Sequence, residues 1–404
     1  MKFSYKAKNK DGAIVEGAVD APDRIAAARQ LREHGEIAFA LVPEREKRHF
    51  SIPIVGALLN RVGLHEKIQF CRNLSGMLSA GLSLYRALGV LEKQTANKKF
   101  KSILGELMKG IDKGETLSQG LEKYPAVFNT LFIAMVRAGE ESGGMVAALK
   151  EVGLNLDKSY ALNKKIKGAL TYPSIIVGAI VIIGILMFMF VVPTLTKTFK
   201  ELNVSLPATT KFIIWVSETI SGHPFLVFGF LIFMTLGLWR ISKIKMLKKY
   251  VDAIILRLPV IGPIAREVNS ARTARTVSSL LVSGVAMTRS LEINKDVLQN
   301  VYYKRILEKS IAAVQKGVPL SKVFSEDTRL YPIMFSEMVE VGEETGKLSQ
   351  MLLDIAEFYE GEVESKTKNL STIIEPVLMV FIGAAVGFFA VSMISPMYSL
   401  LDNL

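Results

Sequence analysis

The sequence predicts an all-α membrane protein with two tandem cytoplasmic helical bundles of about six helices each, three transmembrane helices and a small N-terminal α+β module. Long apolar runs occur in a chain of which 22% of the residues are still charged. This mixture is typical of soluble domains that alternate with membrane segments. A long stretch of sequence also occurs twice at one spacing, and the first residues alternate between apolar and polar as a strand does.

The first 44 residues are expected to form the α+β module. Apolar residues alternate with polar ones in the first strand, and Asp11-Gly12 is a hairpin turn signal before a second strand. A helix is predicted to begin near Asp23 and to end near Gly35, followed by a short strand over 37–42. Its expected apolar face consists of Ile25, Ala28 and Leu31.

Three apolar runs are the predicted transmembrane helices. The first, 174–192, has no charged residue, and the third, 373–394, is broken only by Glu375. Both are long enough to cross a bilayer core of about 30 Å as a helix, and they lack the polar face of a soluble core helix. The second run, 224–239, is only sixteen residues long. It is marginal by length alone, but its flanking charges support a crossing.

Lysine and arginine residues set the expected orientation. They cluster before the first run and after the second, whereas the segment 193–223 has three lysines and two glutamates. The positive-inside rule then places the N-terminus and both repeated regions in the cytoplasm, in a multi-pass inner-membrane protein. The formal net charge of +12 is explained largely by these juxtamembrane residues beside anionic membrane lipid. A nucleic-acid partner is the weaker interpretation of the basic stretch 243–249.

A tandem repeat at one constant offset in residue number, 203, organises the rest of the chain. The matched blocks are 72–88 with 275–291, 114–121 with 317–324, 135–145 with 338–348, and Tyr172-Pro173 with Glu375-Pro376. A further match, YPAVF at 124–128 with YPIMF at 331–335, has an offset of 207. It implies four extra residues in the first copy after Phe128, compensated before Tyr124. Apolar residues recur at helical spacing in both copies, and each copy leads directly into a membrane segment.

The second membrane helix belongs to neither copy and serves as a return crossing, which keeps both copies on one side of the membrane. The predicted domains in chain order are the N-terminal module (1–44), a linker (45–63), the first bundle (64–173), transmembrane helix 1 (174–192), an external loop (193–223), transmembrane helix 2 (224–239), the second bundle (240–372), transmembrane helix 3 (373–394) and an external tail (395–404).

The motif Gly-Glu-Glu-Ser/Thr-Gly occurs once in each copy and supplies the candidate partner-binding residues. They are Gly139, Glu140, Glu141 and Gly143 in the first copy, and Gly342, Glu343, Glu344 and Gly346 in the second. One hypothesis is a helix–helix turn, in which a glycine at positive φ ends the first helix and the Ser142 or Thr345 hydroxyl caps the second. The other is an exposed acidic tip that docks a basic partner or weakly holds a divalent cation.

No catalytic, cofactor-binding or metal-binding residues are expected. No nucleophile, histidine or second acidic cluster accompanies the acidic pairs. The four histidines are scattered at no metal-ligand spacing, and Cys71 is the single cysteine. The stretch 342–349 differs from a phosphate-binding loop, because its glycines are one residue too close and Leu348 stands where a hydroxyl is needed.

Two features of the apolar runs are candidates for membrane-helix packing or function. Glu375-Pro376 lies at the start of the third run, where a carboxylate marks either a functional group or a helix cap in the wet headgroup region. Tyr172-Pro173 holds the equivalent place in the first copy. Gly383 and Gly387 form a small-residue motif of the GxxxG type, which packs helix against helix within one chain or between chains.

Together, the repeat, the two acidic motifs, the prolines before the membrane and the three spans resemble the inner-membrane platform proteins of type IV pilus assembly and type II secretion, the PilC/GspF family. The resemblance covers residues 64–396, and Glu140, Glu141, Glu343 and Glu344 match the family pattern. It implies a non-enzymatic homo-oligomer that engages a cytoplasmic hexameric assembly ATPase, pilin or pseudopilin subunits and other inner-membrane assembly components. Such a platform couples the ATPase to insertion of pilin-like subunits into a filament. Pilus, secretion and DNA-uptake systems all stay open, and a subunit of another membrane transport complex is the alternative.

Overall fold

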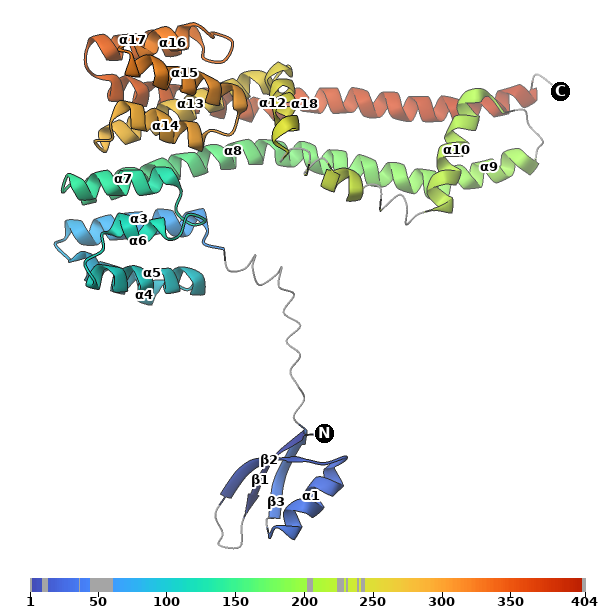
Figure 1. Cartoon of the computed structure of the whole chain (residues 1–404). Helices are drawn as coiled ribbons and strands as arrows, with labels where there is room; N and C mark the ends of the chain where they lie inside the picture. Colours follow the sequence, from blue (N-terminus) through green and yellow to red (C-terminus); the bar gives the residue numbers. More distant parts are fainter. Residues whose placement is uncertain are drawn as a thin grey trace. The chain divides into compact units, whose positions relative to one another are not determined.

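The computed structural model describes residues 2–8, 14–35, 37–43, 61–201, 206–223 and 244–401, together with residues 229, 232–237 and 240. The chain forms two compact units, Met1–Arg61 and Val62–Leu404. The described part of the larger unit is helical, and its longest helices run side by side (Figure 1).

The smaller unit contains a three-stranded antiparallel sheet and one helix. Strand β1 (Lys2–Lys8) lies between β2 (Ile14–Asp20) and β3 (Ile37–Pro43). Helix α1 (Arg24–Glu33) begins after Asp23, whose carboxylate accepts a hydrogen bond from the Ala26 N–H at 2.7 Å. This bond satisfies one of the unpaired N–H groups of the first turn.

The apolar face predicted for α1 is wrong at Ile25, which is 75% exposed. The prediction is confirmed at Leu31, which is buried, and Ala28 is partly buried against the same cluster. Ala27, which was not predicted, is buried beside Leu31. They are one helical turn apart and therefore lie on one face of the helix. The predicted turn at Asp11-Gly12 and most of the linker predicted at 45–63 lie outside the described residues.

Two bundles of equivalent helices make up the larger unit, and each has six helices within the described residues, as the repeat predicted. The first copy comprises α3 (Leu64–Ser79), α4 (Leu84–Gln94), α5 (Lys98–Asp112), α6 (Leu117–Glu122), α7 (Thr130–Glu141) and α8 (Met145–Leu186). The second copy comprises α13 (Ile261–Val282), α14 (Met287–Val297), α15 (Val301–Gln315), α16 (Leu320–Ser325), α17 (Ile333–Glu344) and α18 (Leu348–Leu401), preceded by α12 (Lys245–Arg257).

The four extra residues predicted in the first copy are wrong. Helices α4 to α7 and their counterparts α14 to α17 begin and end at the same constant offset as the main repeat, so nothing is inserted between them. Tyr331 therefore takes the place of Phe128, and both are buried in the aromatic core of their own copy. The two similar pentapeptides are alike in sequence but occupy different places in the fold.

Left-handed glycines mark the same turns in both copies. Their φ angles lie between +68° and +86°, a conformation that costs glycine little and other residues more. The three pairs are Gly81 with Gly284, Gly114 with Gly317, and Gly143 with Gly346. Each glycine follows the end of a helix, so the same three helix ends are fixed in each copy.

Each copy has its own aromatic core. Four phenylalanines meet in the first copy with ring centroids 4.9–6.4 Å apart, namely Phe70, Phe100, Phe128 and Phe132. The equivalent positions of the second copy hold Thr273, Tyr303, Tyr331 and Phe335. There the Thr273 and Tyr331 hydroxyls lie 2.9 Å apart, and the Tyr303 hydroxyl donates to the Leu330 carbonyl at 2.7 Å. Burial raises the pKa of both tyrosines, so these hydroxyls stay neutral and hydrogen-bonded.

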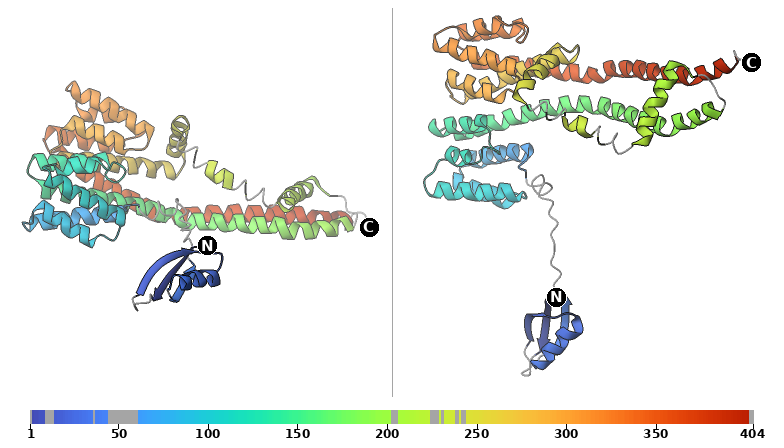
Figure 2. Two further views of the ribbon diagram at one scale, coloured as in Figure 1. Left: turned by 60° about the horizontal axis from the view of Figure 1, so that its bottom comes forward. Right: turned by 45° about the vertical axis from the view of Figure 1, so that its right-hand side comes forward.

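Helices α8 and α18 extend from the bundles as two long apolar helices (Figures 1 and 2). Among the described residues, two helical stretches are long and apolar enough to cross a membrane, Met145–Glu201 and Ile374–Pro396. Their most apolar windows are only 6% and 11% buried, unlike a soluble core helix. They contain all of the first predicted run and all but the first residue of the third. The second predicted run, 224–239, lies largely outside the residues that the structure describes.

The segment predicted as an external loop, 193–223, is helical over most of its described part. A π-helical turn, η1 (Met187–Val191), links α8 to α9 (Val192–Glu201), and α10 (Ala208–Gly222) follows. Because a π-helical turn changes the backbone hydrogen-bond pattern, the Phe188 carbonyl can accept from the Ser217 hydroxyl at 2.6 Å. The Thr210 hydroxyl donates to the Ser392 carbonyl of α18 at 2.5 Å. Helix α10 therefore ties the ends of the two apolar helices together.

One ion pair occurs in both copies but differs sharply in burial. Arg72 lies 3.9 Å from Asp157, and their side chains are 73% and 52% exposed. Arg275 binds the Glu360 carboxylate through two nitrogens at 2.8 and 3.0 Å, and these side chains are only 4% and 17% exposed. The second pair is buried because α13 is packed between the rest of its own copy and the first copy.

Arg275→Ala is expected to destabilise the chain by about 3–5 kcal/mol, because it leaves Glu360 charged, mostly buried and without its main cation. The matched change Arg72→Ala is expected to cost about 0–1 kcal/mol, since both side chains of the Arg72–Asp157 pair are exposed to water. Denaturation of the purified full chain in detergent measures both. Equal losses for the two variants would contradict the difference in burial.

Candidate functional site: the paired Gly-Glu-Glu turns

The two acidic motifs form matching turns between neighbouring helices. Helix α7 ends at Glu141 before α8 begins at Met145, and α17 ends at Glu344 before α18 begins at Leu348. Gly143 and Gly346 have φ of +72° and +68°. A glycine at positive φ therefore reverses the chain at the end of the first helix, as the turn hypothesis requires.

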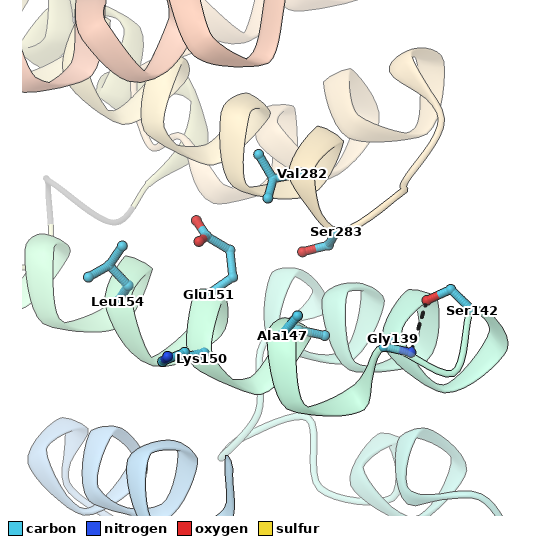
Figure 3. A pocket seen from close by; sticks show the side chains of 10 residues that line it. Gly139, Ser142, Ala147, Lys150, Glu151, Leu154, Val282 and Ser283 are labelled. Atoms are coloured by element: carbon cyan, nitrogen blue, oxygen red, sulfur yellow. Dashed lines mark hydrogen bonds between the residues drawn. The ribbon is translucent and has the colours of Figure 1, made fainter. Parts of the chain in front are cut away.

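The hydroxyls of Ser142 and Thr345 bond to the first helix of each turn, and the prediction that Ser142 caps the second helix is wrong, although its hydroxyl also accepts weakly from the Gly144 N–H at 3.4 Å (Figure 3). Ser142 donates to the Ala138 carbonyl and Thr345 to the Val341 carbonyl, each at 2.7 Å. Both residues precede the left-handed glycine, and their side chains therefore still lie beside the last carbonyls of the first helix. Helix α8 begins without a side-chain cap.

Gly139 and Gly342 allow the two helices of each turn to approach closely. A Cβ atom on Gly139 would lie 2.3 Å from the Ala148 Cβ, and one on Gly342 would lie 2.9 Å from the Leu348 Cα. Both distances are far below van der Waals contact. The first glycine of each motif is therefore a packing residue, buried between its two helices.

The first glutamate of each motif is bound inside its own bundle. The Glu140 carboxylate accepts from the Leu117 and Ser118 N–H groups at 2.5 and 2.9 Å. Glu343 accepts from Leu320 and Ser321 at 2.6 and 3.0 Å. These N–H groups begin α6 and α16, where they have no partner within the helix. Each carboxylate satisfies two of them and complements the helix dipole.

The second glutamate of each motif is the exposed one. Glu141 and Glu344 are exposed, and neither has a hydrogen bond or ion pair within the described part of the chain. Ser174 lies thirty residues after Gly144 along continuous helix, which corresponds to about 45 Å at 1.5 Å per residue. Both turns thus present one free carboxylate far from the apolar segments.

A cavity of about 520 Å³ lies beside the first turn, at the joint between the two copies (Figure 3). Gly139, Ser142, Ala147, Lys150, Glu151 and Leu154 line it from the first copy, and Val282 and Ser283 from the second. The Glu151 carboxylate accepts from the Ser279 hydroxyl at 2.7 Å and is therefore engaged in the joint itself. The described residues contain no group of three or more His, Cys, Asp and Glu that could hold a metal ion.

The candidate residues of the apolar helices lie apart from these turns. Glu375-Pro376 and Tyr172-Pro173 are inside continuous helices, so the expectation that Glu375 caps or ends a helix is wrong. The Glu375 side chain is exposed on α18. Gly383 and Gly387 are also exposed, and a Cβ atom on either would meet nothing within 4 Å. Packing of this motif within the described part of the chain is therefore excluded, and packing between chains stays a prediction.

The role of Glu140 and Glu343 is the part of the site that sequence reasoning missed. Each lies 23 residues after the first N–H group that it binds, and the spacing is the same in both copies. That repeated spacing between a helix start and an acidic residue is the signal that could have revealed it.

These features define a duplicated helical scaffold, in which each copy carries one exposed glutamate at a turn and extends into a long apolar helix. The family model for type II secretion system protein F matches the chain twice, over residues 70–193 and 273–396. The model for the N-terminal domain of the same proteins matches residues 1–40. The two main matches are separated by the same offset as the repeat. The chain belongs to the type II secretion system protein F family.

Similar proteins come from pilus assembly and from secretion. A type IV pilus assembly protein PilC of Thermus thermophilus is 34% identical over 404 residues, covering 100% of this chain and 98% of the relative. PilC of Myxococcus xanthus is 30% identical and covers 99% and 95% of the two chains. A type II secretion system protein F of Vibrio cholerae is 28% identical and covers 98% and 97%.

Glu140→Ala and Glu343→Ala are each expected to destabilise their bundle by about 1.5–3 kcal/mol, because charged hydrogen bonds to two amides are lost. The amides of Leu117 and Ser118, or of Leu320 and Ser321, should then exchange faster with deuterium. Glu141→Ala and Glu344→Ala are the matched controls and should stay within about 0.5 kcal/mol of the unchanged chain. If all four variants had the same stability and exchange, the internal role of the first glutamates would be refuted.

Proposed function

We propose that this chain is a non-enzymatic platform in the cytoplasmic membrane of a type IV pilus or type II secretion-like machine. In this proposal it couples a cytoplasmic hexameric assembly ATPase to insertion of pilin or pseudopilin subunits into a filament. Family membership supports the proposal, as do relatives from both kinds of machine. The two long apolar helices support a place in the membrane.

The proposed topology has three crossings, with the N-terminus and both bundles in the cytoplasm. Helices α8 and α18 provide the first and third crossings, and residues 224–239 provide the second. Lysines 164, 165 and 167 precede the first crossing, and a basic stretch follows the second, as the positive-inside rule requires. Helices α9 and α10 then lie on the outer side, together with the C-terminal tail.

The observation that carries the proposed partner contact is the division of roles within each acidic motif. Glu140 and Glu343 are held by backbone amides, whereas Glu141 and Glu344 are exposed at the equivalent place in both copies. Two related sites on one chain suit a motor with several basic contact surfaces. Complementary charge speeds such an encounter and selects the partner.

Helix continuity supports the proposed coupling. Helix α8 runs without a break from the first turn into the first apolar run, and α18 does the same in the second copy. The ion pair between Lys165 and Glu364 and the cluster of Leu162, Val268 and Val363 hold the two helices together before the membrane. A displacement of the bundles would therefore pass into the membrane segments through packed helices.

The Glu141→Lys and Glu344→Lys double variant is expected to weaken ATPase binding by about tenfold or more and to block filament assembly or secretion, since it reverses the charge of both contact sites. Co-purification of the ATPase with the full-length chain and a filament or secretion assay measure the two effects. Glu308→Lys is the control for reversing a charge outside the two turns, because Glu308 is 59% exposed on α15, where it pairs with Lys295 at 3.6 Å. If the double variant is present at the normal protein level and still binds the ATPase and supports assembly normally, the proposed contact is refuted.

Cysteine labelling tests the topology separately. An impermeant maleimide applied to sealed cells or spheroplasts is expected to label Glu218→Cys on α10, whereas Glu308→Cys should react only after lysis. The native Cys71 gives little background, because it is buried and burial raises the pKa of its thiol. Labelling of both positions from the same side would contradict a crossing between them.

A further inference from the structure

The two copies within one chain are joined through different surfaces. The first copy contributes α7 and the first turns of α8, named here the joining face. The second copy contributes α13 and α14, named here the receiving face. At the centre of the joint, the Asn155 amide donates to the Ser279 hydroxyl at 3.1 Å, and Ser279 donates to Glu151 at 2.7 Å. Arg272 donates to the Asn163 side chain at 2.6 Å.

Because the copies are equivalent, each face has a counterpart, which the other copy does not cover within the described residues of Val62–Leu404. The counterpart of the receiving face is α3 and α4 of the first copy, and that of the joining face is α17 and the start of α18. Burial shows the difference directly. Ser279 and Ile293 are 1% and 0% exposed, whereas the equivalent Gly76 is exposed and Val90 is 37% exposed.

We propose that the joining face of the second copy docks onto the receiving face of the first copy in another molecule of this same chain. Identical chains would then assemble head to tail, each contact repeating the joint already present inside one chain. A contact between two different faces generates a closed ring or an open array rather than a two-fold dimer. This inference goes beyond the proposed function and does not depend on contact with an ATPase.

The sizes of the residues at the centre of the joint support docking of the second copy's joining face onto the first copy's receiving face. Asn155 faces Ser279 within the chain, and the equivalent pair between chains would be Phe358 and Gly76. Phe358 is 45% exposed, and a Cβ atom on Gly76 would meet nothing within 4 Å. A larger side chain on one face is thus matched by a smaller residue on the other, as close packing requires.

A hollow on the first copy lies where the joint would form. A cavity of about 330 Å³ between α3, α4 and α5 is lined by Gln69, Asn73 and Gln94, among others. The equivalent residues of the second copy are Arg272, Thr276 and Val297. Arg272 bonds to the first copy and Thr276 is 3% exposed. Val297 packs against a core cluster that contains residues of both copies. The hollow is therefore at a position that is covered in the second copy.

Charge favours the same pairing. Residues 333–364, which carry the free joining face, contain nine Asp and Glu and one Lys, in a chain whose net charge is +12. Glu343, Glu360 and Glu364 are bound within the chain, which leaves six acidic residues besides these three. Residues 64–94, which carry the free receiving face, contain four Lys and Arg and two Glu. The equivalent segments that pair within the chain differ less in charge. Residues 130–161 contain four acidic and three basic residues, and residues 267–297 contain three acidic and four basic residues. Complementary charge would steer two chains toward this contact.

The direction of the long helices is compatible with one membrane. In both views of Figure 2, α8 and α18 run side by side in the same direction. The next chain would be placed by the same rotation and translation that relates the two copies within one chain. Every apolar helix then stays roughly parallel, as in repeats related by an axis along the membrane normal. Glu141 stays exposed although the joint beside it is formed, so Glu344 would stay exposed in the assembly as well.

Disulfide trapping between two differently tagged full-length chains tests the proposal in native membranes. One chain carries Gly76→Cys and the other Phe358→Cys, and both positions are exposed. Mild oxidation is expected to give a mixed adduct of two chains when the variants are expressed together. Neither variant alone should give an adduct, because the two cysteines lie on different faces.

The control is Asn155→Cys with Ser279→Cys in one chain, which should close within the chain and report that oxidation works. The unchanged chain controls for the buried Cys71. Adducts from either single variant alone would show a two-fold contact and overturn the head-to-tail arrangement. Absence of the mixed adduct, while the control disulfide closes, would overturn the proposal as well. Neither result would affect the charge-reversal test of ATPase binding.

Discussion

The packing of α8 against α13 and α18 is the contact on which the rest of this structure depends. It joins two equivalent bundles so that their long helices run in the same direction, and it buries Ser279 between Asn155 and Glu151 of the first copy. Because both long helices run in the same direction, the two acidic turns lie at one end of these helices and the apolar segments lie toward the other end. The same contact uses a different face of each copy, which is why one face of each kind remains unpaired.

Neighbouring residues of each acidic motif have different roles. The first glycine lets two helices approach, the first glutamate holds the start of a short helix, and the second glycine reverses the chain. Only the second glutamate is left for another molecule. A motif that is alike in both copies can therefore be mostly structural and still carry one residue available for recognition, here Glu141 and Glu344.

The sequence predicted the features that depend on local pattern or on repetition. The helical bundles, the constant offset between the two copies and the glycine turns follow from periodicity and from residues with special backbone freedom. The bonds of Glu140 and Glu343 to helices earlier in the chain could not be predicted in this way, because they depend on how α6 packs against α7 and α16 against α17. The similarity of residues 331–335 to 124–128 gave the wrong prediction of four extra residues. That similarity is local, whereas the place of each pentapeptide in the fold is set by the equivalent helices. The unequal burial of Arg72 and Arg275 arises only when one copy covers the other.

The central claim is that the exposed glutamate of one or both turns meets a cytoplasmic assembly ATPase. The most direct measurement is photo-crosslinking in living cells, with a photoreactive residue in place of Glu141 or Glu344 and identification of the captured protein by mass spectrometry. The account predicts capture of a hexameric secretion-type ATPase from at least one of the two positions. Capture only of the chain itself or of unrelated proteins, from both positions, would contradict it and make the turns structural elements alone.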